Sequence, residues 1–389
     1  MNTAEQTNTD FAVPSPLSYP AARLRLGIAY VGVIVLAAII LLMVDLPGSV
    51  LIRTLEARFS VFAGVGLLIG LWTLLSLPFD LIGGYLMPRA FKREVGSFSR
   101  RLAILVRGAF CHAGFLWMVS AGYLLAAHIG GWALVPVVAV VFLIQQIAGQ
   151  KSFARLVGDL SESKNAPGES RVVPISFASS REASFSGGIV GWPGNDRIVV
   201  AEEWRQKLEP RLYELFVGRR IAAVELGLRR RGVVISFLWN MVGIFGASYL
   251  SGLSGGSLAE LLDFACITTL WSFAGLLLLP GPTRNAVAAI DRQMLAMGYT
   301  REDLAELARV TSDWQDGEKQ RPQAVEAIFH PQPSLENRMA ALEDGSSGWA
   351  AWNVARTTLY LSWSGLGLLS RAVHSNAGRP DLWAMGAVD

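Results

Sequence analysis

The chain has 389 residues, of which 52% are hydrophobic and 17% are charged, and its mean hydropathy is positive at +0.39. This composition excludes an ordinary soluble enzyme and indicates a polytopic membrane protein. The formal net charge is only +3, so the basic character fits membrane-proximal loops better than a nucleic-acid-binding surface. We therefore expect the lipid bilayer to be a partner and nucleic acid not to be one.

The histidine count restricts the metal chemistry open to this chain. The sequence contains only four histidines, which are His112, His128, His330 and His374. No two of them are three, four or five residues apart, so a metal site built on two histidines of one helix is excluded. The two cysteines, Cys111 and Cys266, lie within apolar runs, and we interpret them as small buried hydrophobes.

Six apolar runs are long enough to cross a bilayer. In chain order they cover about residues 26–44, 61–86, 103–127, 130–147, 233–253 and 261–279. Residues 23–149 thus hold four spans, and residues 232–281 hold two more. The polar residues 1–22 before them are predicted to be a disordered tail. Pro280 and Pro282 are expected to end the sixth span, because proline interrupts a helix.

Two polar regions, residues 150–231 and 282–348, follow the fourth and the sixth span. The first is predicted to hold strands at 171–177, 184–191 and 197–200, a helix at 201–215 and a helical run at 219–232. The second is predicted to hold helices at 284–297 and 301–313 and a linker at 345–348. Within the C-terminal part, 349–389, residues 349–369 are predicted to form an interfacial amphipathic helix, with a seventh span left open.

Basic residues gather at alternate ends of the spans. The excess of arginine and lysine on the cytoplasmic side of membrane proteins therefore predicts that the amino terminus and both polar regions are cytoplasmic, in a bacterial inner membrane. The two polar regions are then expected to fold together at the membrane face. The predicted fold class is a mainly α-helical polytopic membrane protein, with about six transmembrane helices and a cytoplasmic α+β domain built from two segments.

Four segments of the polar regions resemble motifs of one protein family. Val224-Glu225-Leu226-Gly227-Leu228 is similar to H-E-L-G-H, a form of the zinc-protease motif H-E-x-x-H. Residues 283–291 resemble S-R-x-x-E-x-x-x-D, residues 330–338 resemble H-P-(x)-S-x-x-x-R, and residues 183–191 with 196–200 resemble an edge hairpin. Taken in chain order, with the hairpin first, the four segments resemble those of the membrane zinc metalloproteases, which include the type I CAAX prenyl endopeptidases and the HtpX-like proteases.

The resemblance implies a zincin-like domain and a role for each matching position. Glu225 stands at the position of the general base, and Val224, Leu228 and Val287 stand at the three zinc-ligand positions. Aliphatic side chains cannot bind zinc, so we expect a degenerate member of the family that carries no zinc cofactor. Val224 and Leu228 are expected one turn apart on one helix, touching Val287 in a dry apolar cluster with Glu225 at its edge.

Asp291 matches the aspartate that, in the family, supports a zinc-bound histidine from the second shell. Without that histidine, we expect Asp291 to pair with an arginine, and the candidates are Arg284 and Arg338. His330 is kept as a further candidate site residue because it can still donate a hydrogen bond.

Three classes of function are weighed. The favoured one is a catalytically inactive metalloprotease homologue that binds membrane proteins or peptides as a regulator or adaptor. An extended partner is expected to add to the edge strand by β-augmentation, along Ser184, Phe185, Ser186, Gly187, Gly188, Ile189, Val190 and Gly191. The alternatives are an active membrane-embedded metalloendopeptidase with a displaced metal site, and a transporter or channel that uses polar groups such as Asn240 and Asp263.

Overall fold

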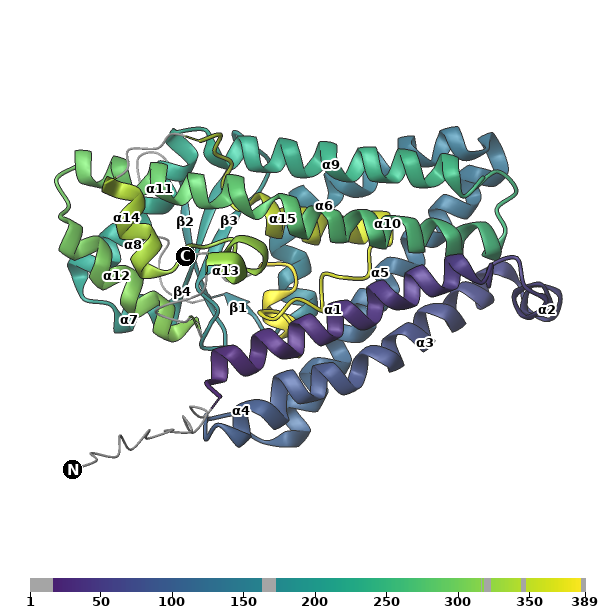
Figure 1. The fold of residues 1–389 in the computed structure, drawn as a ribbon, viewed down its shortest axis with the longest axis horizontal. Helices are drawn as coiled ribbons and strands as arrows, with labels where there is room; N and C mark the ends of the chain where they lie inside the picture. The colour runs from purple at the N-terminus through teal and green to yellow at the C-terminus, as the bar shows by residue number, and fades with distance from the viewer. Residues whose placement is uncertain (1–16, 163–172, 316, 318–322, 344–347, 386–389) are drawn as a thin grey trace, which may run out of the picture.

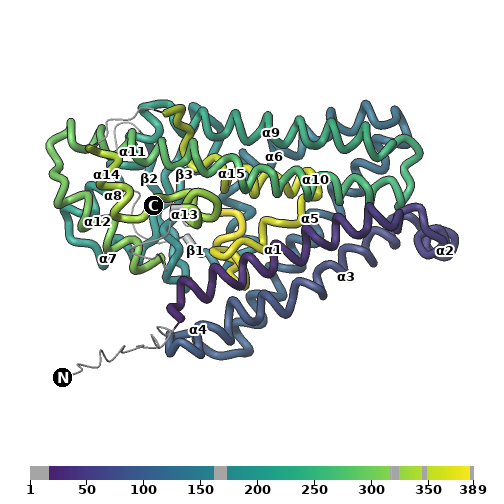
Figure 2. The backbone as a smooth tube through the Cα atoms, in the orientation of Figure 1, coloured from purple at the N-terminus to yellow at the C-terminus, as the bar shows by residue number. Residues whose placement is uncertain are grey.

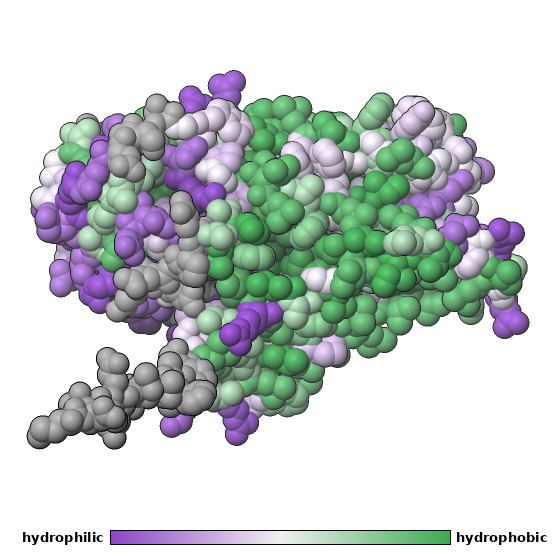
Figure 3. Space-filling model, viewed as in Figure 1, coloured by the Kyte–Doolittle hydropathy of each residue, from purple (hydrophilic) through white to green (hydrophobic). Residues whose placement is uncertain are grey.

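The computed structural model describes residues 17–162, 173–315, 317, 323–343 and 348–385. A long bundle of helices carries a smaller domain of helices and strands at one end (Figure 1). Six helices are long and apolar enough to cross a membrane, and they cover Tyr19–Met43, Val61–Ala90, Phe98–Gly130, Trp132–Val157, Leu228–Leu250 and Leu258–Ala296. Apolar residues cover the bundle, whereas hydrophilic residues gather on the end domain (Figure 3). The prediction of an integral, multi-pass membrane protein is therefore confirmed.

Three helices of the bundle begin with a serine cap. Ser18, Ser60 and Ser257 each accept a hydrogen bond from the first turn of the helix that follows, which satisfies a backbone donor that has no partner within the helix. The elements of the bundle are α1 (Tyr19–Met43), α2 (Val50–Arg58), α3 (Val61–Leu81), a π-helical turn (Ile82–Leu86), α4 (Met87–Ala90), α5 (Phe98–Gly130), a 3-10 turn (Trp132–Leu134), α6 (Val135–Val157), α9 (Leu228–Leu250) and α10 (Leu258–Leu278).

Two boundaries differ from the prediction. Helix α1 begins at Tyr19, so the tail predicted for residues 1–22 ends earlier, and its residues 1–16 lie outside the described residues. Pro280 does not end the sixth span in a loop, because it opens α11 (Pro280–Ala296) directly after α10. A proline fits the first turn of a helix, where its missing N–H would have no partner in any case.

The end domain combines both polar regions, as predicted. Its sheet has the order β1-β2-β4-β3, with β2 parallel to β4 and the other pairs antiparallel. Helix α8 packs against α11 and α12, which come from the second region. The elements are β1 (Ser161–Glu162), β2 (Ile175–Ser179), β3 (Gly187–Val190), β4 (Arg197–Ala201), α7 (Glu202–Lys207), α8 (Pro210–Glu225), α11, α12 (Arg301–Trp314), α13 (Gln323–Phe329) and α14 (Leu335–Glu343). Residues 171–172 of the first predicted strand and 345–347 of the predicted linker lie outside the described residues.

The C-terminal segment, residues 350–385, corrects the prediction most strongly. It forms neither an interfacial helix nor a seventh span. It contains α15 (Val354–Leu361) and two 3-10 turns (Ser362–Gly365 and Pro380–Leu382), and it runs among the helices of the bundle (yellow in Figure 2). Helix α15 packs on α9 and α10, and the turns pack on α5 and α6. Trp363 is 0% exposed and Trp383 is 2% exposed, because the segment is surrounded by the spanning helices.

Polar side chains of the spanning helices bind the C-terminal segment. The Asn240 side chain on α9 donates to the carbonyl oxygen of Thr358 over 3.2 Å. Gln146 on α6 donates to the carbonyl oxygen of Tyr360 over 3.0 Å, and the Tyr360 hydroxyl donates to the Gln146 carbonyl oxygen over 2.9 Å. Buried backbone groups away from water need such partners. These intramembrane amides therefore serve the fold of the C-terminal segment.

A buried ion pair anchors the part of the C-terminal segment that contains Arg371 and Gly378. Arg371 contacts Asp80 of α3, and both side chains are 0% exposed. The other carboxylate oxygen of Asp80 accepts a hydrogen bond of 2.9 Å from the Gly378 backbone N–H. Gly378 has φ +71°, a conformation that glycine adopts readily. Asp80, an acidic residue near the end of an apolar helix, is thus fully enclosed by protein.

Replacing Asp80 by asparagine tests this pair. The amide still accepts a hydrogen bond from Gly378, but Arg371 keeps its charge without a counter-ion. Removing one partner of a buried pair destabilises a protein by about 3–5 kcal/mol. We expect Asp80→Asn to lower the thermal unfolding midpoint in detergent clearly more than the double variant Asp80→Leu with Arg371→Met, in which no charge remains buried. Equal midpoints for the two variants would contradict this account.

Candidate functional site

The helix that carries the predicted metal motif is broken inside the motif. Helix α8 ends at Glu225, Gly227 has φ +68° in the left-handed region, and α9 begins at Leu228. The Gly227 N–H donates to the carbonyl oxygen of Val224 over 2.9 Å, a closure that glycine allows at helix ends. The prediction that Val224 and Leu228 lie one turn apart on one helix is therefore wrong. Glu225 is exposed at this junction.

The third predicted ligand position lies apart from the other two. Val224 and Leu228 pack into the main hydrophobic core. Val287, on α11, instead lines a cavity of about 80 Å³ together with Arg219. The predicted apolar cluster of the three side chains is thus not the arrangement in the structure. The reason is the turn at Gly227, which places the two halves of the motif on helices of different direction.

Asp291 lies at the centre of the observed site. Its side chain is 0% exposed, and it contacts Arg219 of α8 and Arg338 of α14. The Arg338 Nη2 donates to Asp291 Oδ1 over 2.8 Å. The predicted pairing with Arg338 is confirmed. Arg284, the other predicted candidate, donates instead to the carbonyl oxygens of Glu326, Ala327 and His330 at the end of α13.

Sequence reasoning missed Arg219, although the sequence contained a signal. Leu212, Leu215, Phe216 and Ala223 recur at helical spacing and form the buried face of α8. Arg219 falls on that face and is only 4% exposed. An arginine at a core position of an amphipathic pattern requires a buried acidic partner. That requirement could have pointed to Asp291.

The neighbouring Arg220 has a structural role. Its guanidinium donates to the carbonyl oxygens of Val199 over 2.8 Å and Ser186 over 3.1 Å, and it lies 4.2 Å from the centre of the Phe216 ring. It is 0% exposed. Arg220 therefore ties α8 to β4 and to the residue before β3.

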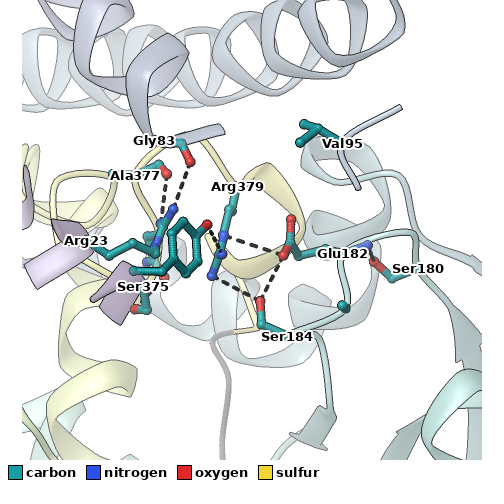
Figure 4. A network of polar contacts seen from close by, with 12 residues as sticks. Arg23, Gly83, Val95, Ser180, Glu182, Ser184, Ser375, Ala377 and Arg379 are labelled. Atoms are coloured by element: carbon teal, nitrogen blue, oxygen red, sulfur yellow. Dashed lines mark hydrogen bonds and ion pairs between the residues drawn. The ribbon is translucent and has the colours of Figure 1, made fainter. Parts of the chain in front are cut away.

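The C-terminal segment reaches the edge of the sheet through Arg379 (Figure 4). Arg379 donates to the Ser184 hydroxyl over 3.2 Å and lies 3.4 Å from the Glu182 carboxylate. The Ser184 hydroxyl donates to Glu182 over 3.0 Å. Burial alone would raise the pKa of Glu182, but Arg379, Arg101 and Arg23 hold that pKa below its ordinary value. The start of the predicted peptide-binding strand is thus engaged within the protein.

Strand β3 is an edge strand by sheet order, as predicted, but it is not open to a partner. Its four residues and the preceding Ser184, Phe185 and Ser186 are all buried, and α6 packs against it. Gly187 has φ +93° and approaches the Val199 carbonyl too closely for a Cβ atom. The glycines therefore serve close strand pairing and the hairpin. A peptide could pair with β3 only after displacing what covers it.

The side chains around Asp291 do not fit a zinc ion. Zinc in proteins is bound by cysteine, histidine, aspartate and glutamate, whereas the neighbours here are two guanidiniums and Val287. Within the described ranges of the chain, no group of three or more such ligands could hold a metal ion. The rings of His330 and His374 lie 4.9 Å apart beside the same cavity, without a third ligand among those residues.

The bundle of spanning helices with a small α/β end domain matches a Ste24-like fold. Among solved structures, the crystal structure of S. mikatae Ste24p is similar, with a TM-score of 0.59 over 75% of this chain and 78% of that chain, at 13% sequence identity. Ste24p is a membrane zinc metalloprotease of the CAAX prenyl endopeptidase type, and at this identity the likeness concerns the fold. No family model and no curated protein matches the sequence.

Replacing Asp291 by asparagine tests the importance of this site for stability. Two buried guanidiniums would lose their shared carboxylate, so we expect a loss of about 3–5 kcal/mol in the free energy of unfolding. Glu306→Gln is the matched control, because its ion pair with Arg309 lies on an exposed helix face where such pairs contribute little. Denaturant unfolding measures both variants, and an Asp291→Asn protein as stable as the control would contradict the assignment.

Proposed function

We propose that this protein is a catalytically inactive homologue of the membrane zinc metalloproteases, which acts by binding a membrane protein or peptide as a regulator or adaptor. The observation that carries the proposal is the contact of Asp291 with Arg219 and Arg338. The resemblance implies that the aspartate at this position supports a zinc-bound histidine. In this chain a guanidinium stands beside it.

The contact of Arg219 with Asp291 also supports a different alignment of the metal motif. The motif then begins five residues earlier, at Arg219 and not at Val224. We infer that Arg219 stands at the first histidine position, Arg220 at the general base and Ala223 at the second histidine. Arg219 and Ala223 lie one turn apart within α8, which is the geometry that the motif requires. A guanidinium stays protonated in proteins and offers no acceptor. Arg219 would therefore repel a metal ion, and Arg220 could not take a proton from water.

The two alternatives find less support. An active peptidase with a displaced metal site needs ligands, and the described residues contain no suitable group. A transporter needs polar groups that face a pathway, but the Asn240 amide is bonded to Ser236 and Thr358. As part of the proposal, the end domain is zincin-like, and it lies with the amino terminus on the cytoplasmic side of a bacterial inner membrane, because the basic residues gather at that end.

Metal content tests the catalytic part of the proposal. The unmodified protein should contain no stoichiometric zinc by elemental analysis, and a chelator should leave its unfolding temperature unchanged. Arg219→His, Ala223→His and Val287→Glu together should create a site, so that zinc raises the unfolding temperature. The matched control is Val224→His, Leu228→His and Val287→Glu, whose two histidines fall on separate helices. Stoichiometric zinc in the unmodified protein, or zinc binding by the control triple alone, would overturn the proposal.

Site-specific cross-linking tests the binding part. Trp192 lies in the β3–β4 hairpin and is 46% exposed, and Phe110 on α5 is 79% exposed on the bundle. A photoreactive residue at Trp192 in native membranes should give a protein adduct of one discrete mass. The same residue at Phe110 should react mainly with lipid, because that position faces the bilayer. No protein adduct at Trp192, or the same adducts at both positions, would count against an adaptor that uses the end domain.

A further inference from the structure

A lipid-facing cavity opens between α1 and α10. It has a volume of about 360 Å³, and its walls include Gly27, Val31 and Gly32 of α1 and Phe273 and Leu277 of α10. The surface over these two helices is apolar (Figure 3), and Leu277 is 44% exposed. In a membrane the mouth of this cavity therefore faces lipid chains and not water.

The inner end of this apolar cavity meets the cavity beside Asp291. Both are lined by Pro331, Arg356, His374 and Ser375. The inner cavity is also lined by Arg219, Arg338 and Arg379. A continuous path thus leads from the lipid-facing groove to a strongly basic region. Such a path has the two parts that an amphiphilic molecule needs, an apolar channel and a polar end.

Arg356 marks the junction. It lies on α15 and lines the apolar cavity, the basic cavity and a third cavity of about 30 Å³. Arg356 is half-buried, and the surface that it retains faces these cavities. Within the described residues it has no ion pair and no side-chain hydrogen bond. Arg371, Arg338 and Arg379, in contrast, each contact a carboxylate.

A half-buried guanidinium without a counter-ion loses part of its hydration, and an anion beside it would offset that penalty. We propose that the two cavities bind one anionic membrane lipid, with an acyl chain between α1 and α10 and a compact acidic headgroup at Arg356. The apolar cavity is several times larger than the basic one, which favours a lipid over a soluble anion. This inference does not depend on the loss of catalysis or on a protein partner.

Lipid binding to the purified full-length protein tests whether Arg356 binds an acidic headgroup. The probes are phosphatidic acid and phosphatidylcholine with the same acyl chains, measured by native mass spectrometry from detergent. We expect phosphatidic acid to be retained preferentially and Arg356→Gln to weaken its binding by about tenfold, as the loss of one charge-assisted contact predicts. Arg25→Gln is the matched control, because Arg25 is an exposed arginine of α1 and should leave binding unchanged.

A second pair of variants tests whether the apolar cavity holds the acyl chain of the lipid. A Cβ atom at Gly32 would meet no atom within 4 Å, so Gly32→Leu should fold and fill the apolar cavity. Gly70 on α3 has equally open surroundings but does not line this cavity. We expect Gly32→Leu to abolish retention of phosphatidic acid and Gly70→Leu to preserve it.

Several outcomes would overturn the proposal. Equal retention of phosphatidylcholine and phosphatidic acid would show that the negative charge of the lipid is not recognised. Unchanged binding of phosphatidic acid by Arg356→Gln would show that the headgroup does not bind at Arg356. Displacement of the lipid by inorganic phosphate at equal concentration would assign the cavity to a soluble anion. Displacement by a short peptide with a free terminal carboxylate would assign it to a peptide. None of these results bears on the zinc content or on cross-linking at Trp192.

Discussion

The structure depends on one constraint, which is that polar groups buried inside the apolar bundle must find partners within the protein. The C-terminal segment brings irregular backbone among six long apolar helices, and every unpaired N–H or carbonyl there would be costly. The spanning helices meet this need with Asp80, Gln146 and Asn240. The buried polar side chains of these three residues therefore serve to bind the C-terminal segment.

The same constraint explains the site at the end of the bundle. In a zinc protease a metal ion supplies the positive charge that the buried carboxylates need. Here Arg219 and Arg338 supply that charge to Asp291, so the aspartate is compensated without an ion. These two ion pairs hold α8 and α14 against α11.

Half-buried Arg356 differs from the buried arginines Arg371 and Arg379. Arg371 contacts Asp80 and Arg379 contacts Glu182, so their burial is balanced within the chain. Arg356 lies where an apolar and a basic cavity meet, which is where the protein itself leaves a charge to be balanced from outside. The cavities therefore connect the bilayer with the region around Asp291.

The sequence alone determined the features that depend on local composition. Runs of apolar residues predicted the six spans, and the polar regions between them predicted a second domain built from two segments. The motif around Asp291 predicted an arginine partner, with Arg338 as one of two candidates. Each of these follows from hydrophobic length or from a short pattern, so neighbouring residues suffice.

Tertiary structure decided the rest, because the deciding contacts join distant residues. Asp80 and Arg371 are 291 positions apart, and no pattern near either one shows that the C-terminal segment enters the bundle. The turn at Gly227 separates Val224 from Leu228, whereas a glycine within an apolar periodic run is compatible with a continuous helix. Arg219 reaches Asp291 only because α8 packs against α11. Buried charges pair according to packing, and packing is a property of the whole fold.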